Sequence, residues 1–262
     1  MNVHVLGHNT YVYTGGHTLD ATLPAIVFIH GGEQDHSAWA LQSRYFAYHG
    51  RNVLVPDLPG HGRSKGPALA SITALADWVA DLLDATAIEQ TSMAGHSMGS
   101  LIALELAARH PQRVARLALL GTAVPMPVAE PLLEAARANE HAALDMINVW
   151  SHGNRAHFGG NTAPGMWMLG TNMRLMERQA RDVLYADFKA CNDYALGTNA
   201  AGNVKCPVLI IAGRRDQMTP PRAAQELARS VSHAQTVLLE DTGHAMLAEQ
   251  PDAVLDALIE FL

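Results

Sequence analysis

The chain has 262 residues, of which 48% are hydrophobic, and its 18 Lys and Arg against 25 Asp and Glu leave a formal net charge of −7. This length suits one domain of roughly 200–250 residues with a modest insertion, and the apolar content excludes a disordered chain. The negative balance argues against a nucleic-acid binder, because such binding depends on clustered Lys and Arg.

Short apolar runs recur along the chain and end in glycine or in a polar loop. The first two, His4–Leu6 and Thr10–Tyr13, alternate in polarity and predict a hairpin at a sheet edge. The later runs are apolar throughout, which is typical of parallel strands buried on both faces. These runs are Ala25–Ile29, Asn52–Pro56, Thr91–Ala94, Arg116–Leu120, Pro207–Ala212 and Thr236–Leu239.

Apolar residues at helical spacing fill most of the gaps between these runs, as in Leu75–Leu83 and Leu101–Ala108. Alternating strands and helices predict an α/β fold with helices on both faces of the sheet. Residues 125–200 break the alternation, contain no clear strand and hold six of the 11 methionines. We interpret them as an all-helical cap, with an irregular link at Ser151–Gly170, inserted into a core formed by residues 1–124 and 201–262.

The strongest chemical signal is the pentapeptide Gly95-His96-Ser97-Met98-Gly99, which lies between a predicted strand and a predicted helix. It matches G-x-S-x-G, the sharp turn that exposes a serine hydroxyl at a helix N-terminus. The glycines keep side chains away where the strand and the helix pack closely. The motif therefore predicts that Ser97 is a nucleophile.

A serine nucleophile needs a base and a carboxylate that orients the base. His244 follows the last predicted strand and Asp216 follows the strand before it. Loops after parallel strands meet at the same sheet edge, so we expect Ser97, Asp216 and His244 to form a catalytic triad. Asp241 is a weaker candidate for the acid, because it is too close to His244 in sequence to reach across the loop.

The segment His30-Gly31-Gly32-Glu33 follows another strand. Missing side chains let backbone N–H groups approach a developing oxyanion, which needs two donors. We assign the N–H groups of Gly32 and Met98 to this oxyanion hole, with Glu33 as the alternative to Gly32. We expect His30 to support the loop rather than carry protons.

Taken together, these motifs resemble the α/β-hydrolase fold superfamily, specifically a serine hydrolase with a helical cap, over nearly the whole chain. The resemblance implies an eight-stranded, mostly parallel sheet with the cap after the sixth strand, and a structural role for the loop Asp57–Ser64. Haloalkane dehalogenases and epoxide hydrolases share this layout but use an aspartate at the elbow, so Ser97 argues against alkyl-enzyme chemistry. The stretch Gly121–Ala123 offers no acid, which leaves Asp216 as the triad acid.

The 14 histidines form no metal-binding pattern. There is no H-E-x-x-H motif, and the glycine-rich stretch Gly60–Gly66 has neither the dinucleotide-binding spacing nor the P-loop order. We therefore predict no metal and no cofactor. We expect His61 and His96 to support loops, and the cap residues His141, His152 and His157 to be solvated or supporting groups.

The predicted activity is hydrolysis of a carboxylic ester or lactone of a small, largely apolar substrate through an acyl-enzyme on Ser97. We expect the substrate pocket to lie between the sheet edge and the cap and to include Trp150, Met166, Trp167 and Met246. The triad does not separate this activity from carbon–carbon bond hydrolysis of a vinylogous diketone. A ligand-sensing protein with slow turnover is the hypothesis from another class.

The sequence also predicts where the protein works and with what. No apolar stretch of about 18 residues exists, and Met1–Val5 lacks the basic and apolar regions of a signal peptide. Cys191 and Cys206 show no CxxC spacing or disulfide framework. We expect a cytoplasmic monomer or homodimer with a small-molecule substrate and no nucleic-acid or membrane partner.

Overall fold

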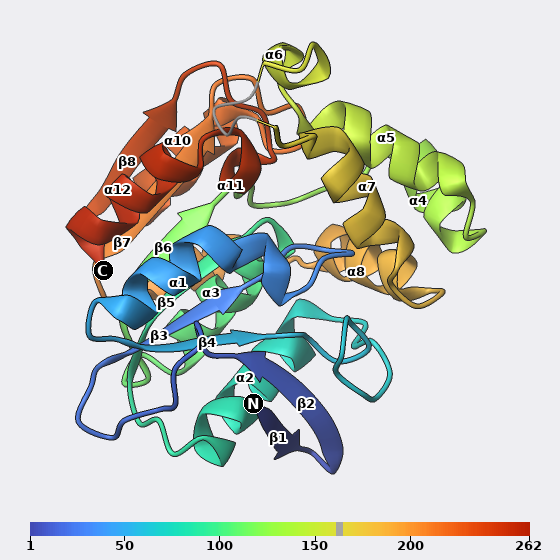
Figure 1. Cartoon of the computed structure of the whole chain (residues 1–262). Coiled ribbons are helices and arrows are strands. Elements are labelled where there is room, and N and C mark those ends of the chain that lie inside the picture. The colour runs from blue at the N-terminus through green and yellow to red at the C-terminus, as the bar shows by residue number, and fades with distance from the viewer. Residues whose placement is uncertain (161–164) are drawn as a thin grey trace.

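The computed structural model describes residues 1–160 and 165–262. Eight strands form one sheet in the order β1-β2-β4-β3-β5-β6-β7-β8 (Figure 1). Strands β1 and β2 form the predicted antiparallel hairpin at one edge, β2 is antiparallel to β4, and all later neighbours are parallel. The strands are β1 (Asn2–Val5), β2 (His8–Tyr13), β3 (Ala25–Ile29), β4 (Asn52–Pro56), β5 (Thr91–His96), β6 (Val114–Leu120), β7 (Val208–Gly213) and β8 (Ala234–Leu239).

The central strands divide their side chains between two apolar layers. In β3, for example, Val27 and Ile29 face one layer while Ile26 and Phe28 face the other. This alternation explains the unbroken apolar runs, because each face of a central strand packs against helices. The expectation of two buried faces is wrong for β8, whose residues Gln235 and Thr236 are exposed. β8 is the last strand of the sheet and pairs only with β7.

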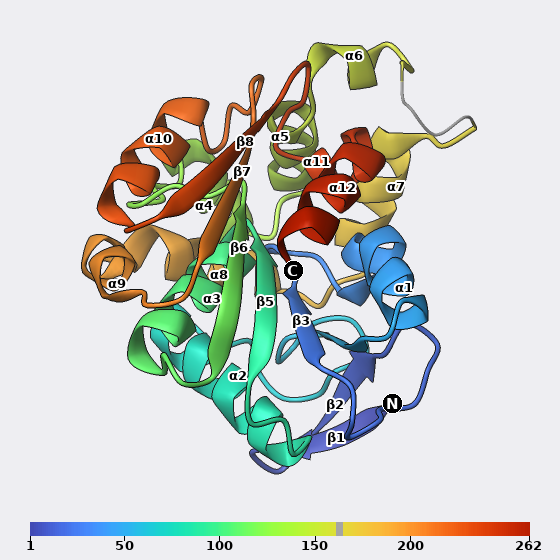
Figure 2. The same ribbon diagram turned by 90° about the vertical axis from the view of Figure 1, so that its left-hand side faces the viewer.

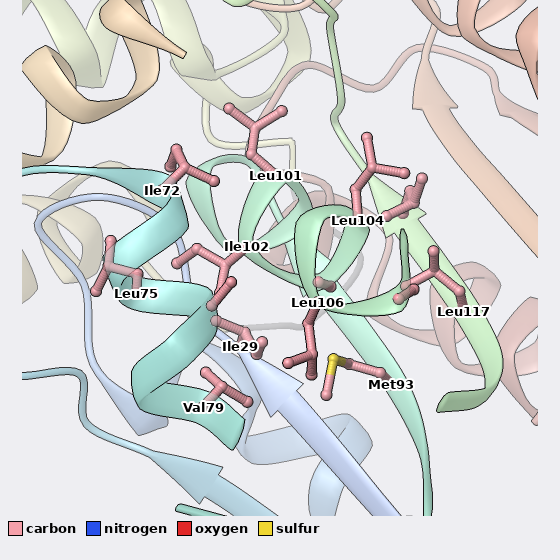
Figure 3. Close-up of a cluster of buried hydrophobic side chains, with 14 of the residues drawn as sticks. Ile29, Ile72, Leu75, Val79, Met93, Leu101, Ile102, Leu104, Leu106 and Leu117 are labelled. Atoms are coloured by element: carbon pink, nitrogen blue, oxygen red, sulfur yellow. The ribbon is translucent and has the colours of Figure 1, made fainter. Parts of the chain in front are cut away.

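Helices cover both faces of the sheet (Figure 2). Figure 3 shows the first layer, in which side chains of α2 and α3 pack against those of β3, β5 and β6. The second layer joins the opposite face to α1 and α12. The helices outside the insertion are η1 (His36–Trp39, a 3-10 helix), α1 (Ala40–Tyr48), α2 (Ile72–Ala85), α3 (Met98–Arg109), α10 (Pro221–Ser230), α11 (Met246–Glu249) and α12 (Pro251–Phe261).

The described residues between β6 and β7 form helices and no strand. They are α4 (Glu130–Arg137), α5 (His141–Ser151), α6 (Asn154–His157), α7 (Met168–Glu177), α8 (Val183–Asp193) and α9 (Gly197–Asn203). Helices α4, α5, α7 and α8 share an apolar cluster of their own, which contains Leu132, Ile147, Met176 and Phe188. Residues 161–164 of the predicted irregular link lie outside the described residues.

The boundary of the predicted cap at residue 200 falls inside α9. This helix packs on α3, and its residues Ala200 and Ala201 belong to the first apolar layer. The division into a core and a cap stays a prediction. Helix α9, at the end of the predicted cap, packs with the helices that cover the sheet. No helix in the described part of the chain is long and apolar enough to cross a membrane.

Candidate active site

Ser97 lies at the turn from β5 into α3, where φ is 53° and ψ is −122°. A positive φ is uncommon for a residue with a side chain and marks a strained turn. The turn is possible because glycines flank it: a methyl group on Gly95 would overlap the backbone of Gly99, and one on Gly99 would overlap the carbonyl of Ile29. The local sequence thus places the half-buried Ser97 side chain at the carboxyl end of the sheet.

The structure brings Asp216 and His244 together, as the strand order predicts. Asp216 follows β7, His244 follows β8, and His244 Nδ1 lies 2.8 Å from Asp216 Oδ2. Both side chains are buried. Burial alone would raise the pKa of Asp216, but the charge of His244 and hydrogen bonds from His244 and Thr219 hold this pKa below its ordinary value. The ionised carboxylate therefore fixes a proton on Nδ1 and leaves Nε2 as an acceptor.

Thr219 was not anticipated from the sequence, although it braces the acid. Its hydroxyl donates to Asp216 Oδ2 at 2.7 Å, and its amide donates to Oδ1 at 2.8 Å. The same hydroxyl lies 3.1 Å from His244 Nδ1. A Thr three residues after an Asp is a local turn pattern, so sequence reasoning had a signal available here.

His244 Nε2 is buried and has no hydrogen-bond partner among the described residues. Ser97 and His244 line the same two cavities, but no hydrogen bond joins Ser97 Oγ to Nε2 in this structure. Such catalytic contacts are often long before substrate binds. His96 helps to position the backbone of His244, because its Nε2 donates a hydrogen bond to the His244 carbonyl at 2.9 Å.

The loop carrying His244 is also tied to the helical insertion. Glu249 accepts hydrogen bonds from the amides of Gly243 and Gly153, each at 2.9 Å. The amide of Ala245 donates to the Ser151 carbonyl at 2.7 Å. Glu249 and Gly153 are 96 positions apart, so no local pattern could have revealed this contact.

The two candidates for the first oxyanion donor differ in the structure. The amide of Glu33 donates to Asp187 Oδ2 at 2.8 Å, so it is already engaged. Gly32 lines both cavities that contain Ser97, and Met98, the first residue of α3, lines one of them. Amides in the first turn of a helix have no intrahelical acceptor, which leaves the Met98 N–H available. The geometry favours Gly32 over Glu33.

Three adjoining cavities surround the site. The central cavity, about 40 Å³, contains Gly32, Ser97 and His244. The inner cavity, about 140 Å³, shares those residues and extends between Leu132 and Trp150. The outer cavity, about 600 Å³, meets the central one at four residues, Gln34, His96, Asn172 and Ala245.

The predicted pocket residues divide among these spaces. Trp150 lines the inner cavity, while Met166 and Trp167 line the outer one. Met246 does not line any of the three: it is completely buried in the second apolar layer, beside the sheet. Its prediction as a pocket residue is corrected, because α11 begins at this residue and turns the side chain toward the core.

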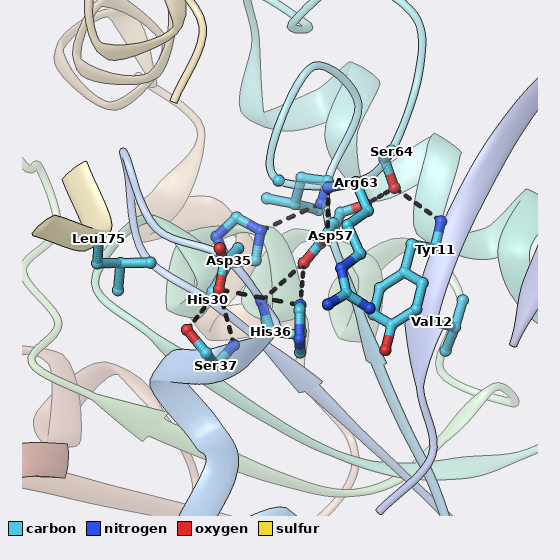
Figure 4. Close-up of polar contacts among 12 residues, drawn as sticks. Tyr11, Val12, His30, Asp35, His36, Ser37, Asp57, Arg63, Ser64 and Leu175 are labelled. Carbon is cyan, nitrogen blue, oxygen red and sulfur yellow. Dashed lines mark hydrogen bonds and ion pairs between the residues drawn. The ribbon is translucent and has the colours of Figure 1, made fainter. Parts of the chain in front are cut away.

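One group of residues, Asp35, His36 and Asp57, has ligand atoms close enough together for a metal ion (Figure 4). Its carboxylates are already hydrogen-bonded. Asp57 accepts from the His36 amide and ring at 2.8 and 2.7 Å and from the Arg63 amide at 2.8 Å. Asp35 accepts from Ser37 and from Arg178 of the insertion. These contacts give the cluster a role in joining loops, in line with the structural role expected for Asp57–Ser64.

The pKa values of two buried histidines predict how the stability of the folded state responds to a fall in pH. Burial lowers the pKa of His30 to about 4 and that of His96 to about 3, and a neighbouring histidine adds to each shift. At these two positions the unfolded chain, with an ordinary imidazole pKa of 6.5, binds more protons below that pH than the folded chain does. Protonation of His30 and His96 in the unfolded chain should therefore lower the stability of the folded state as the pH falls from 6.5 toward 4.

Thermal unfolding followed by circular dichroism between pH 7 and pH 4.5 would measure this effect. We expect His96→Asn to show a shallower decline of the midpoint than the wild type, whatever its midpoint at pH 7. Identical slopes for the two proteins would show that His96 does not contribute.

Comparisons with known proteins identify the family to which the chain belongs. The sequence profile described as alpha/beta hydrolase fold matches residues 24–251, so the chain belongs to this family of hydrolases. A pimeloyl-[acyl-carrier protein] methyl ester esterase from Aromatoleum aromaticum is 30% identical, covering 87% of this chain and 94% of its own. A 2-hydroxymuconate semialdehyde hydrolase from a Pseudomonas species is 31% identical, covering 89% and 84%. The crystal structure of the enol-lactonase from Burkholderia xenovorans LB400 superposes with a TM-score of 0.89 at 26% identity, covering 100% and 99%.

Proposed function

We propose that this hydrolase cleaves a carboxylic ester or lactone through an acyl-enzyme on Ser97. One observation carries the proposal. Ser97, on its strained turn, lines the same cavity as His244, and Nδ1 of His244 is hydrogen-bonded to the buried Asp216 carboxylate. His244 Nε2 takes the Ser97 proton as Oγ attacks the carbonyl carbon, and later gives it to the leaving oxygen. Water then attacks the acyl-enzyme by the same route and releases the acid.

The developing oxyanion is stabilised by the N–H groups of Gly32 and Met98. Losing one such donor typically costs about 3–4 kcal/mol of transition-state stabilisation. The triad and the two amides supply nucleophile, base and electrophile, so the proposed reaction uses no metal or cofactor. Named relatives that act on an ester and an enol-lactone support this reaction class.

Fluorophosphonate labelling tests the nucleophile directly. The wild type should be labelled, and Ser97→Ala should not. Equal labelling of both proteins, or no labelling of either, would contradict the assignment of Ser97.

The cavity volumes predict a substrate with two unequal apolar sides. The outer cavity lies within the range of about 300–1,000 Å³ seen for drug-sized ligands, whereas the inner cavity, about 140 Å³, is far below it. In a series of esters lengthened on one side at a time, kcat/KM should fall at a shorter length on one side than on the other. The expectation of a small substrate therefore applies to one side only.

A matched pair of variants assigns each chain-length limit, the length at which kcat/KM falls, to one of the two cavities. Leu132→Phe narrows the inner cavity and should shorten only the stricter limit, while Leu175→Phe narrows the outer cavity and should affect only the other. If both variants shift the same limit, the two cavities do not hold opposite sides of the substrate.

Carbon–carbon bond hydrolysis is the second candidate, because one relative with 31% identity is named as a 2-hydroxymuconate semialdehyde hydrolase. A p-nitrophenyl ester series assayed beside a vinylogous diketone separates the two. Faster turnover of short esters, with a phenolate burst, would favour ester hydrolysis. Negligible turnover of both substrates, with ligand-dependent binding of a partner protein, would instead favour the ligand-sensing hypothesis.

A further inference from the structure

Two peptide groups flank Gly32, and each has a hydrogen-bond partner, one from the adjacent His30 and one from outside the loop. The carbonyl of Gly31 accepts from His30 Nδ1 at 2.8 Å. The amide of Glu33 donates to Asp187 Oδ2, also at 2.8 Å. In a trans peptide the N–H of Gly32 points away from the Gly31 carbonyl and hence away from His30. The Gly32 N–H lies in the plane of the Gly31–Gly32 peptide, and the Gly32–Glu33 peptide is joined to that plane through the Gly32 Cα atom. The two hydrogen bonds therefore restrict rotation of the backbone on both sides of Gly32.

Asp187 belongs to helix α8 of the insertion, and only 1% of its surface is exposed. Its Oδ2 atom also lies 2.8 Å from His61 Nε2, and His61 comes from the loop after β4. His61 Nδ1 lies 3.0 Å from the Pro59 carbonyl, which only accepts, so Nδ1 carries a proton. Burial alone would lower the pKa of His61, but the charge and hydrogen bond of Asp187 raise it to about 9. Both ring nitrogens of His61 face an acceptor, so near neutral pH the His61 ring carries two protons.

The same helix forms the wall against which the loop packs. A Cβ atom at Gly32 would lie 3.3 Å from both Asp187 Cβ and Phe188 Cε1, so any larger residue there would require these side chains to shift. The next residue, Glu33, has a φ of 55°, in the left-handed region that residues with side chains rarely adopt. The hydrogen bond to Asp187 is made by the amide of this left-handed residue.

We propose that Asp187 is a positioning residue for the oxyanion hole. Paired with His61, it holds the Gly32–Glu33 peptide and so limits the rotation about the Gly32 Cα atom that would turn the Gly32 N–H away from the carbonyl oxygen of a substrate on Ser97. This role rests on the proposed function, because it requires Gly32 to be an oxyanion donor. It also means that a helix of the insertion sets the geometry of an amide that the core loop supplies.

Asp187→Ala tests this role, because it removes the acceptor of the Glu33 amide without adding bulk. We expect kcat for a p-nitrophenyl ester to fall by about 10²-fold, as when one oxyanion donor is lost, with KM within about twofold of wild type. Asp187→Asn keeps an acceptor oxygen and should retain at least about one-tenth of kcat. Asp193→Ala, an exposed position on the same helix, is the matched control and should leave kcat unchanged.

A second measurement separates positioning from a general structural effect. A trifluoromethyl ketone forms a tetrahedral adduct on the serine and places an oxyanion in the hole, whereas the product carboxylic acid binds without such an adduct. Affinity of Asp187→Ala for the ketone should fall in parallel with kcat/KM, while affinity for the acid should stay near that of wild type. An equal fall in both affinities would overturn the proposal in favour of a merely structural role.

If Asp187→Ala does not fold, His61→Leu replaces it, because removing the imidazolium leaves Asp187 without its partner. A similar fall in kcat is expected, and His61→Gln, which can still donate, should restore part of it. A folded Asp187→Ala or His61→Leu protein with wild-type kcat contradicts the role of Asp187 alone. Failure of the wild type to hydrolyse any ester contradicts the proposed function instead, so the two failures are distinguishable.

Discussion

Replacing Ser97 with alanine should lower kcat for ester hydrolysis by about five to six orders of magnitude, the loss seen when a serine-triad nucleophile is removed. The reason is that the strained turn, whose residue Ser97 lines the same two cavities as His244, carries no other described hydroxyl. Steady-state kinetics on the best p-nitrophenyl ester would measure the loss. Ser92→Ala, which replaces a buried serine on β5, the strand that leads to Ser97, is the matched control and should stay within about threefold of wild type.

The other triad members should act as one unit with Ser97. Asp216→Asn should cost about 10⁴ in kcat, because it permits the wrong imidazole tautomer. The double variant Ser97→Ala with His244→Ala should be no slower than Ser97→Ala alone, since the remaining rate comes from the oxyanion hole and binding. Losses that multiply in the double variant would show that Ser97 and His244 do not work together.

Replacing Gly99 with alanine should destabilise the fold by about 3 kcal/mol, at the upper end of the usual cost of overpacking. The added methyl group would overlap the carbonyl oxygens of Ile29 and His30, and a backbone cannot move aside as a flexible side chain can. For a chain of this size we expect the thermal midpoint to fall by about 6–12 °C. Activity should also fall, because α3 would be pushed away from β3 and would carry Ser97 with it.

Gly202→Ala is the matched control for this prediction. Gly202 lies on an exposed position of α9, and a methyl group there would have no heavy atom within 4 Å. Replacing a helical glycine at such a position should stabilise the protein by about 0.5–1 kcal/mol. Differential scanning calorimetry of both variants checks the pair. A Gly99→Ala midpoint equal to that of Gly202→Ala would contradict the close backbone approach at the turn.

The sequence by itself predicted the strands of the sheet and placed Ser97, Asp216 and His244 in loops that follow strands. It also predicted that Asp216 and His244 lie close together. Those features depend on local patterns: unbroken apolar runs, glycines around Ser97 and polar residues at strand ends. Where the pattern was weak, the prediction was incomplete. Helix α1 was missed, since it turns the polar residues Gln42 and Ser43 inward and leaves Leu41 exposed.

The tertiary structure alone decided which groups hold the site in shape. His61 and Asp187 are 126 positions apart, and their pairing depends on how α8 of the insertion packs against the loop after β4. The choice of Gly32 over Glu33 as oxyanion donor followed from the same contact, because Asp187 occupies the Glu33 amide. Met246 joined the core for a similar reason, through the packing of α11 under the sheet. Local patterns specify which strand end bears a reactive group, whereas long-range packing specifies which neighbours orient it.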